Sequence, residues 1–390
     1  MHDNQVKNKR YSIVIAGDLL PSDENVKLFE RGDSKQLFGE EICNIFQNAD
    51  FSIANLEGPL TDVDEKRLKA GPSIKSTKKS IKGIKALGLS ALALANNHIL
   101  DYGEVGFSDT LEVLNEHSIL SVGIGRTESL LKSYISVNLG DKRVCIYNVS
   151  ETFMNVPGET EPCVHYYDEY VVCNDLKRLK ETHEYIIVIY HGGSEFFQYP
   201  TPLLSKRFRR MADSGADFVV SQHSHCIGCE EYYHNSYFLY GQGNFLFARQ
   251  KVFPELTKEG LLIEIIFENC EVIIKKHYYK IEHGVIRLKK SYDFSSFLMR
   301  SSQVHNTDMI LDEFQKLKVG EIMNKYLIAY KGYYPFRRIM FKLFRRQSLN
   351  WLQRSYNSDH ILRILHTVMC ERRNEDMLYV LKYLLDKNRK

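Results

Sequence analysis

The chain has 390 residues, of which 44% are hydrophobic and 26% charged, and its formal net charge at pH 7 is +3. These values are ordinary for a soluble globular protein and allow one large domain with an appendage. No apolar run approaches the roughly 18 residues that a membrane-spanning helix needs, and the polar residues 1–10 contain no apolar signal core. The eight cysteines follow no disulfide-like spacing, which indicates a reducing compartment and predicts a cytoplasmic location.

Strand and helix patterns alternate along the first 290 residues and predict an α/β fold. Apolar, β-branched runs predict strands at residues 11–16, 50–54, 89–95, 120–124, 134–138, 144–149, 185–190, 216–220, 237–240, 261–267, 272–279 and 285–290. Helical patterns occupy residues 38–46, 80–87, 104–117, 175–183 and 203–214. Residues 61–79 are charged and residues 156–168 contain Pro and Gly, so both are expected to be loops.

The charge is unevenly distributed, which predicts a body at residues 11–300 and a basic, aromatic-rich helical extension at residues 301–390. Ten basic residues stand against two acidic ones in residues 331–373, a net charge of +8. Such a segment suits peripheral contact with an anionic inner-membrane surface or with an anionic polymer. The alternative is an appendage that packs its aromatic side chains on the body. No nucleic-acid-binding motif accompanies the charge, so nucleic acid is not the expected partner.

Polar side chains follow six of the predicted strands at the point where each strand ends. They are Asp18; Asn55 and Glu57; Asn97 and His98; His191 and Glu195; His223 and His225; and Asn244. Because open α/β sheets place their chemistry at the carboxyl ends of strands, we expect these groups to converge on one edge of the sheet. An amide oxygen there can bind a metal, and an imidazole can exchange a proton.

Carboxylate, amide and imidazole groups form a mixed oxygen and nitrogen ligand set that suits Mn, Fe or Zn. Two divalent ions about 3.5–4 Å apart would clamp the oxygens of a displacement and lower the pKa of a water toward about 7. His223 and His225 are two residues apart and can each face a different ion. Glu57 is the best candidate for the carboxylate that bridges the two ions.

The order of these motifs resembles the metallophosphoesterase (calcineurin-like) superfamily. Within it, the sequence resembles the CapA-like branch, which serves bacterial capsule and poly-γ-glutamate synthesis. The motifs that carry the resemblance are Gly17-Asp18, Asn55-Leu56-Glu57-Gly58, Asn96-Asn97-His98, His191-Gly192-Gly193, His223-Ser224-His225 and Gly243-Asn244-Phe245. The resemblance covers about residues 11–290 and implies a four-layer α/β/β/α sandwich.

The resemblance also implies a role for each site residue. The implied ligands of the first ion are Asp18, Glu57 and His225, and those of the second are Glu57, Asn97, His191 and His223. His98 would protonate the leaving oxygen while Asp101 orients it. The expected substrate-binding residues are Asn55, Glu195 and Asn244.

Three positions depart from the wider superfamily. Leu20 stands where a histidine usually follows the first aspartate, so the first metal site has one ligand fewer and its occupancy stays open. Glu57 replaces an aspartate, as it does in the CapA-like branch. Gln222 stands where a glycine usually precedes His-x-His.

These features predict a metal-dependent hydrolase, with a phosphoester as the expected substrate, acting in capsule, poly-γ-glutamate or exopolysaccharide biosynthesis. Two alternatives remain open. The first is a non-hydrolytic capsule-assembly factor that binds an anionic polymer or a membrane partner. The second is metal-dependent amide or acyl chemistry on such a polymer.

Overall fold

The computed structural model describes residues 10–22, 24–67, 69, 71–152, 162–247, 254–269, 271–289, 291, 293–322, 376–377 and 380. The chain divides into two compact units. The first contains residues 1–67, 73–151 and 157–305, and the second contains residues 68–72, 152–156 and 306–390. All of the motifs singled out in the sequence belong to the first unit.

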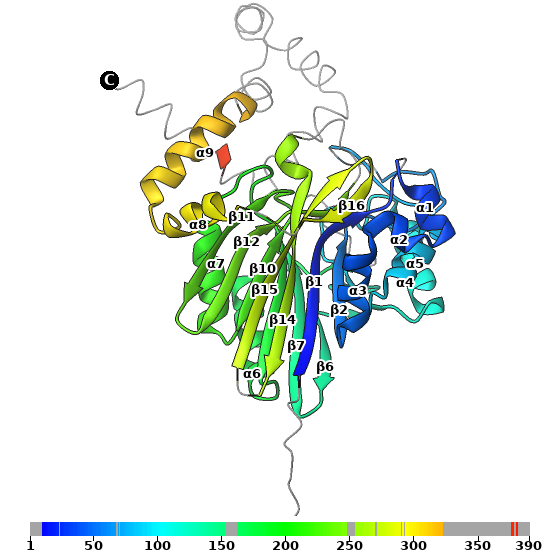
Figure 1. The fold of residues 1–390 in the computed structure, drawn as a ribbon, viewed down its shortest axis with the longest axis horizontal. Coiled ribbons are helices and arrows are strands. Elements are labelled where there is room, and N and C mark those ends of the chain that lie inside the picture. The colour runs from blue at the N-terminus through cyan, green and yellow to red at the C-terminus, as the bar shows by residue number, and fades with distance from the viewer. Residues whose placement is uncertain are drawn as a thin grey trace, which may run out of the picture. The chain divides into compact units, whose positions relative to one another are not determined.

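Two β-sheets form the centre of the first unit (Figure 1). The sheet that contains β1, here called the β1 sheet, has the order β16 (Val285–Leu288), β15 (Glu271–Glu282), β14 (Glu259–Glu268), β1 (Arg10–Leu20), β2 (Phe51–Leu56), β3 (Ala91–Ala93) and β4 (Leu120–Val122), and β13 (Asn244–Phe247) also pairs with β1. The second sheet, here called the β9 sheet, has the order β11 (Ile227–Tyr233), β12 (Ser236–Gln242), β10 (Phe218–Gln222), β9 (Tyr185–His191), β7 (Lys142–Ser150) and β6 (Tyr134–Leu139). β5 (Ile124–Gly125) and β8 (Cys163–Val164) form a short separate pair.

The helices of the first unit lie on the outer faces of these sheets (Figure 1). Those packed on the β1 sheet are α1 (Val26–Arg31), α2 (Ser34–Phe38), α3 (Glu40–Asn48), α4 (Ile81–Leu87) and α5 (Gly103–Glu116). Those packed on the β9 sheet are α6 (Glu169–Lys180) and α7 (Pro202–Asp213). α8 (Ser295–Ser302) packs beside β11.

The period-two alternation of strand residues creates three apolar layers. Along β1, Ile13 and Ile15 face the β9 sheet, whereas Val14 and Ala16 face the helices of the β1 sheet. In the same way, alternate residues of β9 face the β1 sheet or pack against α6 and α7. Because helices cover both outer faces, the central strands are buried on both sides and have continuous apolar sequences. The predicted four-layer α/β/β/α sandwich is confirmed.

Several predicted elements differ in extent from those in the structure. β3 contains only Ala91–Ala93, because the chain leaves the sheet before the polar triplet. α6 begins at Glu169, earlier than predicted, where the Asp168 carboxylate accepts a hydrogen bond from the Val171 amide (2.9 Å). The first turn of α6 escaped the prediction because Tyr170 and Val171 are exposed and interrupt the apolar period.

β11 and β13 were not predicted from the sequence. β11 contains Cys229 and begins one residue after Cys226; both cysteines are buried, and neither belongs to the candidate metal-ligand groups found among the described residues. The Cys-x-x-Cys pair is therefore part of the core.

β13 begins at Asn244, so this residue starts a strand rather than ending one.

The second unit contains α9 (Thr307–Ile322), in which Phe314 is buried. The basic segment at residues 331–373 lies outside the described residues, so its predicted membrane or polymer contact stays a prediction. Within the described part of the chain, no helix combines the length and the apolar character that crossing a membrane requires.

We predict that Phe208→Ala lowers the free energy of unfolding by about 3–5 kcal/mol, because it removes a completely buried ring from the core. Phe208 packs against Tyr190, Phe238 and Tyr240 with ring centroids 4.8–5.7 Å apart. The control is Tyr170→Ala on α6, where the side chain is 79% exposed and the expected change is below about 0.5 kcal/mol. Urea denaturation measures both, and equal effects of the two variants would contradict the assigned core.

Candidate metal centre

A bulge in β1 places the Asp18 carboxylate. The strand continues to Leu20 instead of ending at Ala16 as predicted, and its register with β2 shifts between Ala16 and Asp18. A Cβ on Gly17 would lie 2.1 Å from the carbonyl oxygen of Gly243, so the close approach of the residue just before β13 requires glycine there. The irregularity re-aims the Asp18 side chain, as bulges near functional sites often do.

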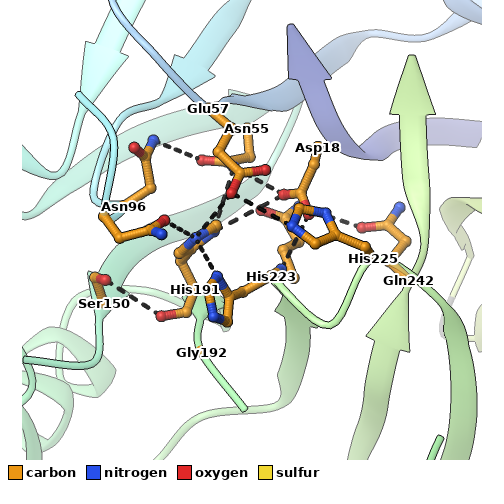
Figure 2. Close-up of polar contacts among 12 residues, drawn as sticks. Asp18, Asn55, Glu57, Asn96, Ser150, His191, Gly192, His223, His225 and Gln242 are labelled. Carbon is orange, nitrogen blue, oxygen red and sulfur yellow. Dashed lines mark hydrogen bonds and ion pairs between the residues drawn. The ribbon is translucent and has the colours of Figure 1, made fainter. Parts of the chain in front are cut away.

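The Glu57 carboxylate lies at the centre of the site (Figure 2). Glu57 directly follows β2 and is fully buried. Neither of its carboxylate oxygens has a hydrogen-bond partner in the described part of the chain. Glu57 Oε1 lies 3.7 Å from His191 Nε2 and 3.7 Å from His225 Nε2. A buried carboxylate without donors requires positive charge nearby, so this group is poised to bind cations.

Two groups of potential ligand atoms share Glu57. Asp18, Glu57 and His225 form one group, and Glu57, His191 and His223 form the other; the ligand atoms within each group lie within 4.8 Å of one another. In the second group, His191 Nε2 lies 2.9 Å from Asn97 Oδ1 and 3.1 Å from His223 Nδ1. The structure thus brings together all six residues expected to bind metal.

The ligands come from two sheets, so the expectation that they converge on one edge of a single sheet was wrong. In the β1 sheet, Asp18 lies in β1, Glu57 directly follows β2, and Asn97 lies in the loop after β3. His191 ends β9 in the β9 sheet, and His223 and His225 follow β10. The site is formed where the carboxyl ends of the central strands of two packed sheets meet.

The His-x-His turn has an unusual backbone. His223 has φ +82° and His225 has φ +56°, a left-handed conformation that residues other than glycine rarely adopt. The backbone N–H of His223 donates to Asp18 Oδ2 (3.0 Å), which ties the turn to the β1 sheet. Backbone strain of this kind persists where the surrounding structure fixes it, and it occurs often at functional sites.

Asn55 was expected to bind substrate, but the structure places it beneath the ligands. It is fully buried, and its Nδ2 donates to Asp18 Oδ1 (2.8 Å) and lies 3.3 Å from His191 Nδ1. Its Oδ1 accepts a hydrogen bond from Asn96 Nδ2 (3.1 Å). This environment suits a residue that orients metal ligands, as carboxylate and amide partners of ligands do in metal sites.

Asn244 is placed in the same manner. It is buried, its Oδ1 lies 2.8 Å from His225 Nδ1, and its Nδ2 donates to the carbonyl oxygen of Thr257 (3.1 Å). An N–H at His225 Nδ1 that points at this amide leaves Nε2, the nitrogen that faces Glu57, as the ligand atom. Asn244 therefore lies where it can hold the His225 ring in one orientation.

Asn96 was not predicted from the sequence to have a role of its own in the site. Its Oδ1 accepts hydrogen bonds from the backbone N–H groups of His98 (3.0 Å) and Ile99 (2.9 Å), and its Nδ2 donates to Leu56 O (2.8 Å). This side-chain turn shapes the loop that carries Asn97 and His98. The signal available in the sequence was an asparagine at the end of a buried strand, a residue type that often forms such turns.

His98 and Asp101 form a hydrogen-bonded pair on the same loop. His98 Nδ1 lies 2.7 Å from Asp101 Oδ2, and the Ile74 backbone N–H donates to the same oxygen (2.8 Å). Asp101 is fully buried, whereas the His98 side chain is 12% exposed.

The remaining predicted residue, Glu195, has a side chain that is 34% exposed, with its Oε1 3.8 Å from His223 Nε2.

The two carboxylates of the site have opposite electrostatic behaviour. Burial and then the negative charge of Asp18 raise the pKa of Glu57 well above its ordinary value. Burial also tends to raise the pKa of Asp18, but the His225 hydrogen bond and the charges of His191 and His225 outweigh it and lower that pKa. For His225, burial lowers the pKa, and the charges of Glu57 and Asp18 reverse the effect and raise it to about 10.

These residues fit a pair of divalent cations. Carboxylate, amide and imidazole are the donors that Mn, Fe and Zn accept, and cations would neutralise the carboxylate of Glu57, which no donor satisfies within the described residues. Leu20 stands at the position where the wider superfamily usually has a histidine. Its side chain is buried against Ile74 and Phe247 and supplies no ligand. The group around Asp18 therefore has fewer ligands than the group around Asn97.

We predict opposite effects of neutralising the two carboxylates in the metal-free protein at pH 7. Glu57→Gln should raise Tm, because a raised pKa means that ionisation destabilises the folded state above the unfolded pKa. Asp18→Asn should lower Tm, because a lowered pKa means that the ionised form stabilises the folded state at this pH. The Glu57 difference should shrink as the pH falls toward about 4, the ordinary range of a glutamate pKa, whereas the Asp18 difference should shrink only as the pH falls below about 4. Thermal unfolding measures them, and equal destabilisation by both variants would show that Glu57 is paired.

Comparison with solved structures finds a distant similarity. The structure is similar to a phosphatase from Mycoplasma pneumoniae, at 14% sequence identity and a TM-score of 0.44, covering 74% of this chain and 99% of that chain.

Sequence relatives are found among capsule proteins. The chain is 25% identical over 267 residues to the capsule biosynthesis protein CapA of Bacillus anthracis, covering 66% of this chain and 64% of that protein. It is 27% identical over 241 residues to the PGA biosynthesis protein CapA of Bacillus subtilis (strain 168), covering 60% and 63%. The chain thus spans less than two thirds of the length of these relatives. The family model described as bacterial capsule synthesis protein PGA_cap matches residues 12–249, and the chain belongs to this family.

Proposed function

We propose that this protein is a metal-dependent hydrolase of the capsule synthesis family that cleaves a phosphoester bond. The observation that carries the proposal is the buried carboxylate of Glu57, which stands between two groups of ligand atoms and has no hydrogen-bond partner among the described residues. A carboxylate placed in this way suits a bridge between two cations. Two divalent cations would supply the positive charge that stabilises the oxygens of a phosphoryl displacement.

The proposed ligands are Asp18, Glu57 and His225 for one ion, and Glu57, Asn97, His191 and His223 for the other. Mn, Fe and Zn suit this donor set. Asn55 and Asn244 orient ligands through their side-chain amides.

His98 is the proposed proton donor to the leaving oxygen. Because its Nδ1 faces Asp101 at 2.7 Å, Nε2 is the nitrogen at which a proton is exchanged with substrate. Asp101 is fixed in turn by the Ile74 backbone N–H, so the imidazole is held in one orientation. This pair performs general acid catalysis while the neighbouring Asn97 serves as a ligand.

The proposed substrate belongs to the assembly of an anionic capsule polymer. The two curated relatives are named for capsule biosynthesis and PGA biosynthesis. An anionic polymer or a phosphoester intermediate of its synthesis is attracted to a centre that holds two cations. The basic segment at residues 331–373 is a further proposed contact for such a polymer or for an anionic membrane surface.

We predict that the purified protein contains Mn, Fe or Zn and that His223→Ala removes most of it, because the second group then loses one of its ligands. Elemental analysis after gel filtration measures the metal content. His234→Ala, an exposed histidine in the turn between β11 and β12, is the control and should retain the metal. A wild-type protein that holds no metal even after reloading would favour the non-hydrolytic assembly factor.

We predict that His98→Asn lowers kcat on an alkyl phosphoester by about 10²–10⁴-fold and leaves the metal content unchanged. An aryl phosphoester with a good leaving group should lose far less activity, because its leaving oxygen needs no proton. Steady-state kinetics on the two esters separates these effects. Equal kcat of variant and wild type on the alkyl ester would exclude His98 as the general acid.

A further inference from the structure

β1 changes its pairing partner close to the metal ligands. Its antiparallel pairing with β14 ends at Ile15 opposite Ile263, and its parallel pairing with β13 begins at Asp18 opposite Asn244. Buried backbone carbonyls at such a change of partner need other donors, because an unpaired buried carbonyl is unfavourable. Three backbone carbonyls in this region accept hydrogen bonds from two side chains. None of the sequence motifs predicted a role for these two residues.

Gln222 and Gln242 donate those hydrogen bonds. Gln242 Nε2 donates to the carbonyl oxygens of Ile15 (2.6 Å) and Leu261 (2.9 Å). Gln222 Nε2 donates to the carbonyl oxygen of Ala16 (2.9 Å) and to Gln242 Oε1 (3.2 Å). Both side chains are buried and come from the β9 sheet, whereas the three carbonyls belong to the β1 sheet. The pair therefore joins the two sheets.

The joined segments carry the metal ligands. Gln222 is the last residue of β10 and directly precedes His223, and in the strand register it lies opposite His191. Gln242 is the last residue of β12, two residues before Asn244, which lies against His225. Ala16 is two residues before Asp18. The same four hydrogen bonds thus hold ligands of one sheet against ligands of the other.

Stability alone does not explain the choice of residue at position 222. Gln222 Oε1 is buried and has no hydrogen-bond partner among the described residues, which is a cost to the folded state. The amide nitrogen of Gln222, in contrast, makes two hydrogen bonds, and one of them reaches the strand of Asp18. The glycine that the metallophosphoesterase superfamily usually has at this position carries no side chain and could make neither of these hydrogen bonds.

We propose, building on the metal centre proposed above, that Gln222 and Gln242 are positioning residues that set the distance between Asp18 and the His-x-His turn. They contact neither metal nor substrate themselves. Their amides close the gap in the pairing of β1 and so fix Asp18 of the β1 sheet against the histidines that follow the strands of the β9 sheet. Loss of either amide lets the two strand ends separate and weakens metal binding without removing a ligand.

The test is a Co²⁺ titration of the metal-free full chain, followed by the visible absorption of the bound ion. Gln222→Met and Gln242→Met keep the length of the side chain and remove the amide. Each should weaken Co²⁺ binding by about 10- to 100-fold, as loss of residues that orient ligands does, and should alter the visible spectrum. Because the two amides are hydrogen-bonded to each other, the double variant should lose less than the sum of the single effects.

Asn25→Ala is the matched control. Asn25 is also a buried amide that joins distant segments, since its Nδ2 donates to the carbonyl oxygen of Gly284 (3.0 Å) and its Oδ1 accepts from the Ser22 backbone N–H (2.9 Å). Its substitution should lower Tm and leave the Co²⁺ affinity and spectrum unchanged. The control therefore separates a general loss of stability from the expected loss of Co²⁺ affinity and change of the visible spectrum.

Three outcomes would overturn the positioning role. Co²⁺ affinity and spectrum equal to those of the wild type in folded Gln222→Met and Gln242→Met would show that the amides do not set the site. An equal loss of affinity in Asn25→Ala would show that the effect is one of stability. A wild-type chain that binds no Co²⁺ would remove the proposed metal centre itself. If Gln242→Met fails to fold, Gln222→Gly gives the same measurement with the residue that the superfamily carries.

Discussion

The buried carboxylate of Glu57 is the constraint on which the rest of the site depends. A carboxylate removed from water without hydrogen-bond donors is strongly unfavourable unless positive charge compensates it. The residues around Glu57 have the required character, because three histidines, a second carboxylate and an amide surround it. A site of this kind would be more stable with bound cations than without them, so cation binding would contribute to the folding energetics of the centre.

The negative charge of Glu57 is compensated only if the two sheets meet at a defined distance, because the groups around it come from both sheets. The apolar layer between them, formed by residues such as Ile15 and Ile189, supplies most of the burial but little directionality. Hydrogen bonds from buried amides supply the direction. Besides Gln222 and Gln242, Asn148 of β7 accepts hydrogen bonds from the backbone N–H groups of Leu94 (3.1 Å) and Ala95 (2.8 Å), just before the loop of Asn97.

The sequence predicted the fold well and also which polar residues lie close together, because both depend on local signals. Apolar runs mark strands that are buried on both faces, and polar groups at their ends mark the edge where chemistry occurs. What could not be predicted depends on tertiary contacts. Asn55 and Asn244 were expected to touch substrate, and the structure places them against Asp18 and His225, because the sequence does not show which polar group lies beneath another. Gln222 was visible only as a departure from a motif.

Backbone irregularities were also invisible in the sequence, although they place the ligands. The bulge at Gly17 and the left-handed His223 and His225 break the regular ladders at the ends of β1 and β10. The left-handed residues turn the chain away from the line of β10, and both histidines of this turn lie near Glu57. The regular core therefore holds the irregular segments, and the irregular segments aim the ligands.

The two ligand groups are not equivalent, and the difference follows from Leu20. This side chain lies with Ile74 and Phe247 in a small apolar cluster, two residues beyond Asp18 on the same strand. The Asp18 group therefore has three ligand residues, whereas the Asn97 group has four when Glu57 is counted in both. An ion held by fewer protein ligands is bound more weakly and retains open coordination positions, which is the character of a catalytic site rather than a structural one. The Asn97 side would anchor its ion, and the Asp18 side would leave room for the oxygens of a substrate.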